Sequence, residues 1–459
     1  MKVIKFGGTS LATGAQVQRA IAIVTADADR RVMVVSAPGK RQSDDVKVTD
    51  HLQQLADCVV DGLSTQPIAA QIIARYQEIA TYFGLPAETV DYLQKHLDLI
   101  IRRVYPDIHY LYAALMAQGE FMNAKLISAV MQHLGLPARF VSPRDLGLIV
   151  DGQPQAVRIR EESYAHIADF QLTPDEIIIV PGFFAYDQQG QITTFTRGGS
   201  DITGSILARG FHADLYENFT DVSCVYAVDP KIVAHPRAIN TLTYREMREL
   251  AYSGFSVFNH EAILPVIDVG IQVNLKNTND PTAPGTLIVP DKDINHHHRI
   301  TGIALNKNYI GLYLHRYLMN TEVGFTFRLL KILRKYSISY EYLPSGIDDL
   351  TIVINKDQLP GHLKERLLTD LKAEVHPDQL RWFDDFAVLM IVGEGLYLHA
   401  DLLAKIMTKL SEKNIIPLMI NQGASRISLM IGVHAEQAEE AVRAIYTLSE
   451  QHQDVTTKD

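Results

Sequence analysis

Cysteine is almost absent from the 459 residues, which contain only Cys58 and Cys224. Two cysteines cannot build a disulfide framework, so the class of small disulfide-stabilised secreted domains is excluded and a reducing, cytoplasmic location is expected. Long apolar runs are also missing. The best candidate, residues 177–180, stops at Pro181, far short of the roughly 20 residues that a membrane-spanning helix needs. No signal peptide precedes the strand-like residues 2–6, so no membrane association is predicted.

An excess of positive charge is missing as well. Lys and Arg number 43 against 53 Asp and Glu, which gives a formal charge of −10. A surface for nucleic acid or anionic lipid needs a basic stripe, so both partners are excluded. The 47% hydrophobic and 21% charged residues are those of an ordinary globular protein, and the length predicts two or three domains.

Residues 1–290 alternate short β-branched runs with helical stretches. The clearest runs are largely apolar and give way to Gly, Pro or Ser, which is typical of strands buried on both faces of a mainly parallel sheet. These runs are residues 2–6, 31–36, 138–142 and 176–180. The pattern predicts an α/β fold in which helices sandwich the sheet.

Residues 51–132 lack such runs, and their apolar residues recur at helical spacing. They predict a helical block that covers the sheet or carries a lid. One helix face is expected to hold Leu93, Leu97, Ile100, Ile101 and Val104.

A break follows at the Pro- and Gly-rich residues 281–290, and the polar residues 291–300 are expected to be a linker. The histidines at 296–298 have no further spaced ligands nearby, so no metal site is predicted. Residues 301–459 show a strand–helix–strand–strand order twice, which indicates two ferredoxin-like α+β units. The units are expected at approximately 301–380 and 381–459, with an intertwined arrangement left open.

The first strand leads into Lys5-Phe6-Gly7-Gly8-Thr9-Ser10. The lysine precedes the glycines, so this is not a P-loop. Two glycines nevertheless let backbone N–H groups approach a polyphosphate, and Thr9 and Ser10 can start a helix whose N-terminus favours anions. Lys5 would add a positive charge where a transferred phosphoryl group develops negative charge. A plain tight connection is the alternative interpretation.

A second cluster, residues 196–204, also lies where a strand is expected to meet a helix. Arg197 offers a planar fork for a carboxylate, and Gly198 and Gly199 permit close approach. Ser200 and Asp201 can bind a ligand or cap the helix. A capped turn has no need of an arginine beside two glycines, so we favour a functional role.

Three further clusters carry polar groups. Residues 34–39 open a strand into a loop that contains Ser36, and Glu120 places a carboxylate in the helical block, where a solvated face is the default interpretation. Residues 219–231 supply a hydroxyl, carboxylates, an aromatic ring and a cation, which suit a nucleotide.

These clusters, in this order, resemble the aspartate kinase family of the amino-acid-kinase superfamily, over nearly the whole chain. Residues 5–10 resemble the family's KFGGTS start, residues 197–201 are identical to its RGGSD motif, and residues 226–231 resemble its VYTADPR segment. The C-terminal units resemble its two ACT modules, with residues 420–425 similar to its ISQGSS segment.

The resemblance implies an amino-acid-kinase fold for residues 1–290 and tandem ACT domains for residues 301–459. It also implies ATP as co-substrate, Mg²⁺, and L-aspartate as the phosphate acceptor. The residues that it implies for ATP binding are Lys5, Phe6, Gly7, Gly8, Thr220, Asp221, Tyr226 and Lys231. The residues that it implies for aspartate binding are Ser36, Thr49, Glu120, Arg197, Gly198, Gly199 and Ser200, where Glu120 would bind the ammonium and Arg197 the α-carboxylate. Lys5 and Asp201 would be catalytic, with Asp201 orienting Lys5 or water around Mg²⁺.

Two positions depart from the family pattern. Lys231 replaces the usual arginine, which keeps the charge but loses the fork. Ser256 occupies the position of a nucleotide-contacting lysine, which puts the adenine or ribose contact in doubt. A subgroup of the family shares this form, so the site is not expected to be inactive.

The predicted nucleophile is a carboxylate with an ordinary pKa of about 3.9, so no general base is required. The product would be an acyl phosphate. Following the family, the first ACT unit would bind a feedback effector, lysine first and threonine second, at a subunit interface of a homodimer or homotetramer. The effector residues would be Thr321, Gly324, Phe325 and Glu341, with Glu341 on the effector ammonium. The alternative is that the ACT units only dimerise.

Two rival functions remain. One is another carboxylate or carbamate kinase of the superfamily, and the other is a catalytically inactive amino-acid sensor. Retention of Lys5, Glu120, Arg197 and Asp201 favours the aspartate kinase. The resemblance shows no homoserine dehydrogenase segment after the ACT modules, so a monofunctional enzyme is expected.

Overall fold

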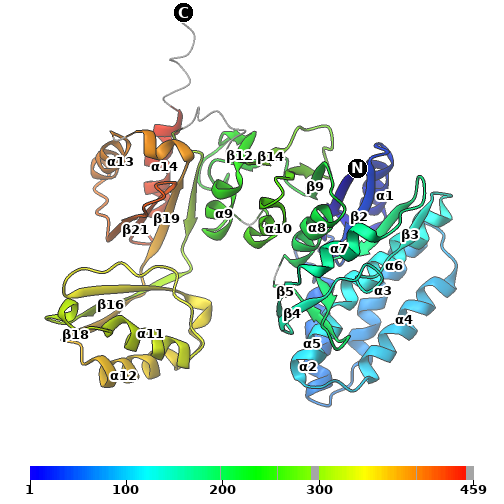
Figure 1. Ribbon diagram of the computed structural model, residues 1–459, viewed down its shortest axis with the longest axis horizontal. Coiled ribbons are helices and arrows are strands. Elements are labelled where there is room, and N and C mark those ends of the chain that lie inside the picture. Colours follow the sequence, from blue (N-terminus) through cyan, green and yellow to red (C-terminus); the bar gives the residue numbers. More distant parts are fainter. Residues whose placement is uncertain (197, 256, 291–298, 400, 451–459) are drawn as a thin grey trace, which may run out of the picture. The chain divides into compact units, whose positions relative to one another are not determined.

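The computed structural model describes residues 1–196, 198–255, 257–290, 299–399 and 401–450 (Figure 1). Arg197, Ser256, and most of the predicted linker with its three histidines lie outside the described residues. The chain divides into two compact units, each described here by itself. The first comprises residues 1–225, 238–251 and 256–294, and the second comprises residues 226–237, 252–255 and 295–459.

The first unit is built on an eight-stranded sheet in the order β12-β14-β13-β9-β1-β2-β6-β3. Only β13 and β14 pair antiparallel. The predicted, mainly parallel α/β sheet is therefore confirmed. The strands are β1 (Lys2–Phe6), β2 (Arg30–Val35), β3 (Ala138–Phe140), β6 (Ile177–Pro181), β9 (Leu215–Thr220), β12 (Thr241–Thr243), β13 (Gln272–Asn277) and β14 (Thr286–Val289).

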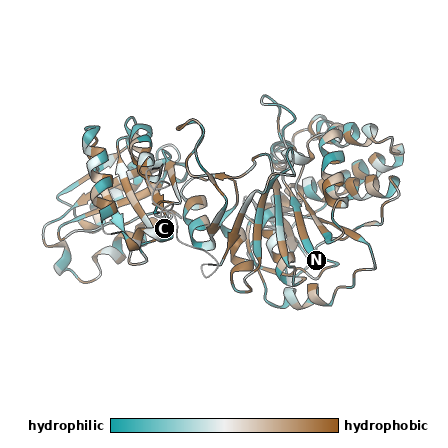
Figure 2. Ribbon diagram, turned by 90° about the horizontal axis from the view of Figure 1, so that it is seen from above, coloured by the Kyte–Doolittle hydropathy of each residue, from teal (hydrophilic) through white to brown (hydrophobic). Residues whose placement is uncertain are grey.

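Strand β6 is wholly apolar, and the buried parts of β1 and β2 are largely apolar, because helices cover both faces of the sheet. Figure 2 shows the apolar residues along these strands. The helices described in residues 1–290 are α1 (Gly14–Thr25), α2 (Val48–Val60), α3 (Gln66–Tyr82), α4 (Ala87–Arg102), α5 (Ile108–Met116), α6 (Gln118–His133), α7 (Glu162–Asp169), α8 (Gly199–Gly210), α9 (Tyr244–Tyr252) and α10 (Leu264–Ile267).

The predicted helical block is formed by α2 to α6, and α3, α4 and α6 lie side by side (Figure 1). Leu93, Leu97 and Ile100 face its core as expected. The prediction for Val104 is wrong, because α4 ends at Arg102 and Val104 is 91% exposed. Pro106 disfavours helical backbone just before it, which accounts for an early end of the helix.

The described residues before 290 also form three two-stranded ribbons. They are β4 (Val150–Gln153) with β5 (Ala156–Ile159), β7 (Phe184–Tyr186) with β8 (Ile192–Thr194), and β10 (Val225–Tyr226) with β11 (Ala238–Ile239).

The second unit contains two antiparallel sheets. In the first, β17 (Asp349–Asn355), β16 (Tyr309–His315) and β18 (Gln379–Phe383) form a sheet whose apolar face shares a core with α11 (Phe325–Lys335) and α12 (Leu363–Val375). The second sheet has the order β15-β19-β21-β20 and is accompanied by α13 (Asp401–Glu412) and α14 (Ala438–Glu450). Its strands are β15 (Gly302–Asn306), β19 (Ala387–Val392), β20 (Met419–Gln422) and β21 (Ser428–Val433).

The two modules are interleaved along the chain. β15 pairs with β19, so residues 309–383 form the first module as an insertion between two neighbouring strands of the second. The second module has the four strands and two helices of a ferredoxin-like unit, and for the first module the structure describes three strands and two helices. The predicted fold class, an α/β unit followed by α+β modules, is confirmed. The domain limits proposed from the sequence stay predictions. None of the helices in the described residues is long and apolar enough to span a bilayer.

Candidate active site

Lys5 and Asp201, two of the predicted site residues, meet near the carboxyl ends of strands β1 and β9. Lys5 of β1 lies opposite Asn218 of β9 in the parallel ladder. Asp201 comes from the first turn of α8, and its Oδ1 lies 2.6 Å from the Nζ of Lys5. Only 10% of the Lys5 side chain and 11% of the Asp201 side chain are exposed. The carboxyl ends of parallel strands are the usual ligand-binding edge of an α/β sheet, so this buried ion pair marks the candidate active site.

Asp201 is held by more than Lys5. The Nδ2 of Asn218 donates to its Oδ1 at 2.8 Å, and the backbone N–H of Asn259 donates to its Oδ2 at 3.3 Å. The hydroxyl of Tyr216 donates to its backbone oxygen at 3.2 Å. Asn218 and Asn259 were not anticipated from the sequence. The sequence signal for Asn218 was a polar pair, Glu217 and Asn218, between the aromatic residues Tyr216 and Phe219 of β9.

The two glycines of the first loop serve close packing as well as any ligand. A Cβ on Gly8 would lie 2.8 Å from the backbone oxygen of Ala37. A Cβ on Gly39 would lie 2.6 Å from the carbonyl carbon of Gly8, and Gly39 N–H donates to the Gly8 oxygen at 2.8 Å. The loops after β1 and β2 therefore touch backbone to backbone. Gly7 N–H donates to Phe219 O at 3.0 Å, which ties the same loop to β9.

Thr9 and Ser10 begin a 3₁₀ helix, η1 (Thr9–Leu11), and the longer helix α1 starts only at Gly14. The Ser10 hydroxyl is buried and lies 2.7 Å from the hydroxyl of Thr278. Its visible role is therefore to join the loop to the segment after β13.

Glu120 is not the solvated carboxylate of the default interpretation. It lies in the first turn of α6 and is 4% exposed. Burial raises the pKa of its carboxyl to about 8, although the backbone N–H of Ala37 and the charge of Lys5 act in the opposite direction. Its Oε2 has no hydrogen-bond partner among the described residues. A cationic ligand group would satisfy this oxygen.

Ser36 and Thr49 bracket the segment that joins β2 to α2. The backbone N–H of Ser36 donates to the backbone oxygen of Phe6 at 3.2 Å, and the backbone oxygen of Ser36 accepts from Asn123 Nδ2 at 2.6 Å. Thr49 is half-buried in the first turn of α2. Because Ala37 N–H reaches Glu120, this segment and the start of α6 form one wall.

Gly198 and Gly199, from the second cluster (residues 196–204), also have packing roles. Gly198 has φ +81°, and a Cβ there would lie 2.4 Å from the side-chain nitrogen of Asn259. A Cβ on Gly199 would meet Phe183 at 2.8 Å. Ser200 is buried. The fork of Arg197 stays a prediction because that residue lies outside the described part of the chain.

Of the predicted nucleotide residues, Thr220 and Asp221 end β9, next to Phe219 and the Gly7 amide that bonds to it. Thr220 donates its hydroxyl to Asp221 Oδ1 at 3.2 Å. Tyr226 and Lys231 belong to residues 226–237, which are counted with the second unit. Their roles stay predictions, as does the consequence of Ser256.

The predicted effector residues lie in the first module of the second unit. Gly324 has φ +83° and caps α11, Phe325 is buried in the module core, and Thr321 donates to the Leu318 oxygen at 2.8 Å. Glu341 accepts a hydrogen bond from the hydroxyl of Tyr252. This partner was not foreseen, because it lies 89 residues earlier in the chain.

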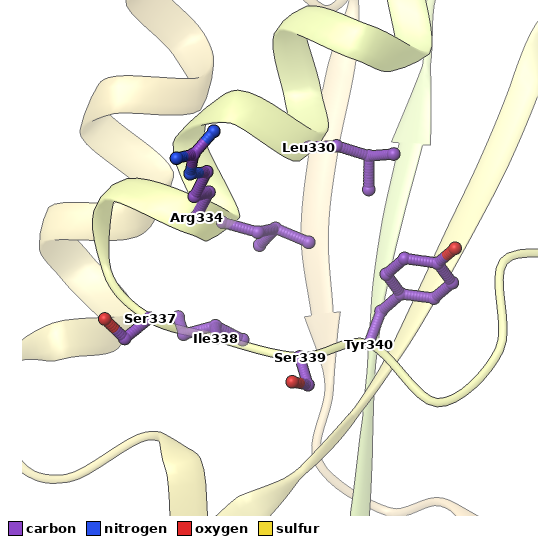
Figure 3. Close-up of a pocket in the computed structure, with 7 residues that line it drawn as sticks. Leu330, Arg334, Ser337, Ile338, Ser339 and Tyr340 are labelled. Carbon is purple, nitrogen blue, oxygen red and sulfur yellow. The ribbon is translucent and has the colours of Figure 1, made fainter. Parts of the chain in front are cut away.

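A pocket of about 510 Å³ adjoins this region, between the C-terminal half of α11 and residues 337–340 (Figure 3). Arg334 and Tyr340 lie on opposite sides of it. The last residue that lines this pocket, Tyr340, immediately precedes Glu341 in the chain.

Comparison with known proteins agrees with this geometry. Residues 1–277 match the amino acid kinase family, and residues 389–448 match an ACT domain. Aspartokinase 3 of Bacillus subtilis is 41% identical over 446 residues, which are 97% of this chain and 98% of the relative.

Solved structures of two other proteins are also similar. Aspartate kinase of Clostridium acetobutylicum superposes with a TM-score of 0.86 at 34% identity, over 98% of this chain and 100% of that one. Aspartokinase III of Escherichia coli, 24% identical, was solved with aspartate and ADP (TM-score 0.81; 97% and 99% covered) and with lysine and aspartate (0.79; 98% and 99%). At that identity the likeness to the E. coli enzyme concerns the fold.

Proposed function

The chain belongs to the amino acid kinase family, and within it to the aspartate kinases; from this premise we propose how its residues phosphorylate aspartate. The reaction transfers the γ-phosphoryl group of ATP to the β-carboxylate of L-aspartate. The observation that carries the assignment of roles is the buried Lys5–Asp201 pair at the carboxyl end of the sheet, beside an unsatisfied buried glutamate.

The chemistry is positioning and charge neutralisation. One β-carboxylate oxygen forms the new bond to phosphorus as the bond to the bridging oxygen of ADP breaks, and no proton has to be removed from the nucleophile. Two anions must approach in line, so a cation beside them lowers the barrier. Lys5 supplies that cation.

Lys5 changes partner during the reaction in this proposal. Its ammonium neutralises Asp201 in the structure, and the γ-phosphate of ATP competes for it. Asp201 keeps its position because Asn218 and the N–H of Asn259 still donate to it. These two groups therefore hold the carboxylate of Asp201 in place while Lys5 moves between the two anions.

Mg²⁺ is part of the proposal. No group of three or more His, Cys, Asp or Glu within the described ranges is placed to hold a metal ion. Mg²⁺ usually binds through substrate phosphates, waters and one or two carboxylates, and the buried carboxylate of Asp201 beside Lys5 suits that mode of binding. Asp201 would supply the carboxylate, and the ion would neutralise charge on the phosphates.

Glu120 would bind the ammonium of aspartate. Its buried Oε2 lacks a donor, and an ammonium has three. Arg197 would take the α-carboxylate, while Ser36 and Thr49 would line the same pocket from the β2–α2 segment. The product would be an acyl phosphate, so an enzyme that consumes such activated carboxyl groups must follow to draw the reaction forward.

Feedback control is assigned to the first ACT module, with lysine as the first candidate effector and threonine as the second. Glu341 would bind the effector ammonium in competition with the Tyr252 hydroxyl. A homodimer or homotetramer joined through the ACT modules and a cytoplasmic location complete the proposal.

The test is trapping of the product. An acyl phosphate reacts with hydroxylamine to give a hydroxamate, so the purified chain with ATP, Mg²⁺ and aspartate should yield aspartyl hydroxamate and ADP in equal amounts. Glutamate, N-acetylglutamate and carbamate serve as competing substrates. ADP release with another acceptor, or with none, would contradict the aspartate assignment.

A further inference from the structure

Arg75 is an arginine in the interior of the helical block. It lies in the middle of α3 on the face that also carries Ile72 and Ile79, and it is only 5% exposed. Its Nε has no hydrogen-bond partner within the described residues. Arginine is rarely buried in this way unless it is paired, because removing its charge from water is costly.

The three polar contacts of its fork all go to one segment. Nη2 donates to the Gly39 oxygen at 2.6 Å, Nη1 donates to the Val46 oxygen at 2.9 Å, and Nη1 lies 3.1 Å from Asp45 Oδ2. Gly39 and Val46 are near opposite ends of the connection between β2 and α2. One rigid guanidinium therefore holds this connection at both ends.

The connection carries the proposed substrate contacts. Ser36 is its first residue, Thr49 lies just after it in the first turn of α2, and the backbone N–H of Ala37 reaches Glu120. The backbone oxygen of Gly39 accepts from Arg75, and the backbone N–H of Gly39 donates to the backbone oxygen of Gly8 in the loop after β1, the proposed phosphate-binding loop. A shift of this backbone would therefore be felt at both substrates.

The next residue of α3 reinforces the link. The hydroxyl of Tyr76, fully buried, donates to the Gly119 oxygen at 2.9 Å, immediately before Glu120. Arg75 and Tyr76 thus connect α3 to both parts of the wall that borders the proposed aspartate pocket, the β2–α2 connection and the start of α6. On the outer side, Arg41 binds Asp45 twice at 2.9 Å, but Arg41 is exposed and its contacts are expected to matter less.

We propose that Arg75 is a positioning residue for aspartate: its fork fixes residues 36–49 so that Ser36, Thr49 and the Ala37–Glu120 contact are set before the substrate binds. This inference rests on the proposed function of that segment. Lysine cannot replace Arg75, because an ammonium on a flexible stem cannot reach two carbonyls and a carboxylate with one planar geometry.

The experiment compares Arg75→Lys and Arg75→Met with Ile79→Ala, a matched loss of buried contacts on the same helix face. For each variant we would measure kcat, KM for aspartate, KM for ATP, the thermal unfolding midpoint, and hydrogen exchange of residues 39–46. Both Arg75 variants should lower kcat/KM for aspartate by about 10²-fold, the scale of a 1 Å misplacement. Their exchange in residues 39–46 should be faster, and KM for ATP should change less than KM for aspartate.

Ile79→Ala should lower the midpoint while leaving KM for aspartate and the exchange of residues 39–46 unchanged. Millimolar guanidinium added to Arg75→Ala should restore part of the aspartate kinetics, and ammonium should not. If the Arg75 variants only lose thermal stability, as Ile79→Ala does, the residue is structural and the proposal is overturned.

If Arg75→Met does not fold, Arg75→Lys decides by the same readouts, since it keeps the charge and much of the volume. Failure of the proposed function would look different. The wild-type chain would then not phosphorylate aspartate, yet hydrogen exchange would still report whether Arg75 holds residues 39–46.

Discussion

Aspartate binding should release a proton from Glu120. The carboxyl has a pKa of about 8 in the ligand-free structure because it is buried. At pH 7 only about one tenth of the molecules carry the charged form. The ammonium of aspartate favours the charged form, so binding at pH 7 should release about 0.9 proton per site.

The same linkage sets the pH dependence of affinity. If only ionised Glu120 binds the ammonium, the apparent Kd varies as one plus ten to the power of the pKa minus the pH. Affinity for aspartate should therefore increase about 25-fold from pH 6.5 to pH 8.5 and level off above the pKa. Affinity thus rises with pH, whereas it would fall with pH if binding needed a protonated group.

Titration calorimetry at pH 7 in buffers of different ionisation enthalpy measures the proton release directly. Glu120→Gln is the isosteric control: it should bind about 10-fold or more weakly, without proton release and without the pH dependence. Succinate, which lacks the ammonium, should release much less. Equal heats in all buffers, or an aspartate Kd that is flat from pH 6.5 to 8.5, would refute the role of Glu120.

Four further changes test other parts of the site. Lys5→Ala should reduce kcat by about 10²–10³-fold without unfolding the protein, and a kcat within a few-fold of wild type in a coupled ADP assay would remove Lys5 from catalysis. Asn218→Leu should reduce kcat with little effect on KM for aspartate, because Asp201 loses a donor that does not touch that substrate; a change confined to KM would contradict this. Arg197→Lys should raise KM for aspartate more than KM for ATP, since a point charge cannot reproduce the fork, and the reverse pattern would move Arg197 to the nucleotide. Tyr252→Phe should strengthen inhibition by lysine, or by threonine, because Glu341 no longer has a competing hydroxyl; calorimetry that detects neither effector would leave the ACT modules without a sensing role.

The helical block shows how far local pattern alone reaches. Periodicity predicted a helical block over residues 51–132, which α2 to α6 form, because an apolar stripe with a 3.6-residue period is visible in the sequence. It failed at Val104, where backbone restriction near Pro106 outweighed the apolar side chain. It also predicted a solvent-exposed Glu120, because nothing in the neighbouring sequence shows that this side chain is buried and accepts a hydrogen bond from the backbone N–H of Ala37.

The sequence by itself determined the fold class, the family and the chemistry of the motifs, because buried parallel strands and Gly-rich strand ends leave local signals that need no partner. Only the tertiary structure decided which distant residues share a site. Asn218 meets Asp201 because two parallel strands and the start of α8 converge, and Arg75 meets Gly39 because α3 packs beside the β2–α2 connection. Likewise, β15 pairs with β19 across an inserted module. Such contacts depend on packing between segments far apart in the chain, and neither periodicity nor motif spacing encodes them.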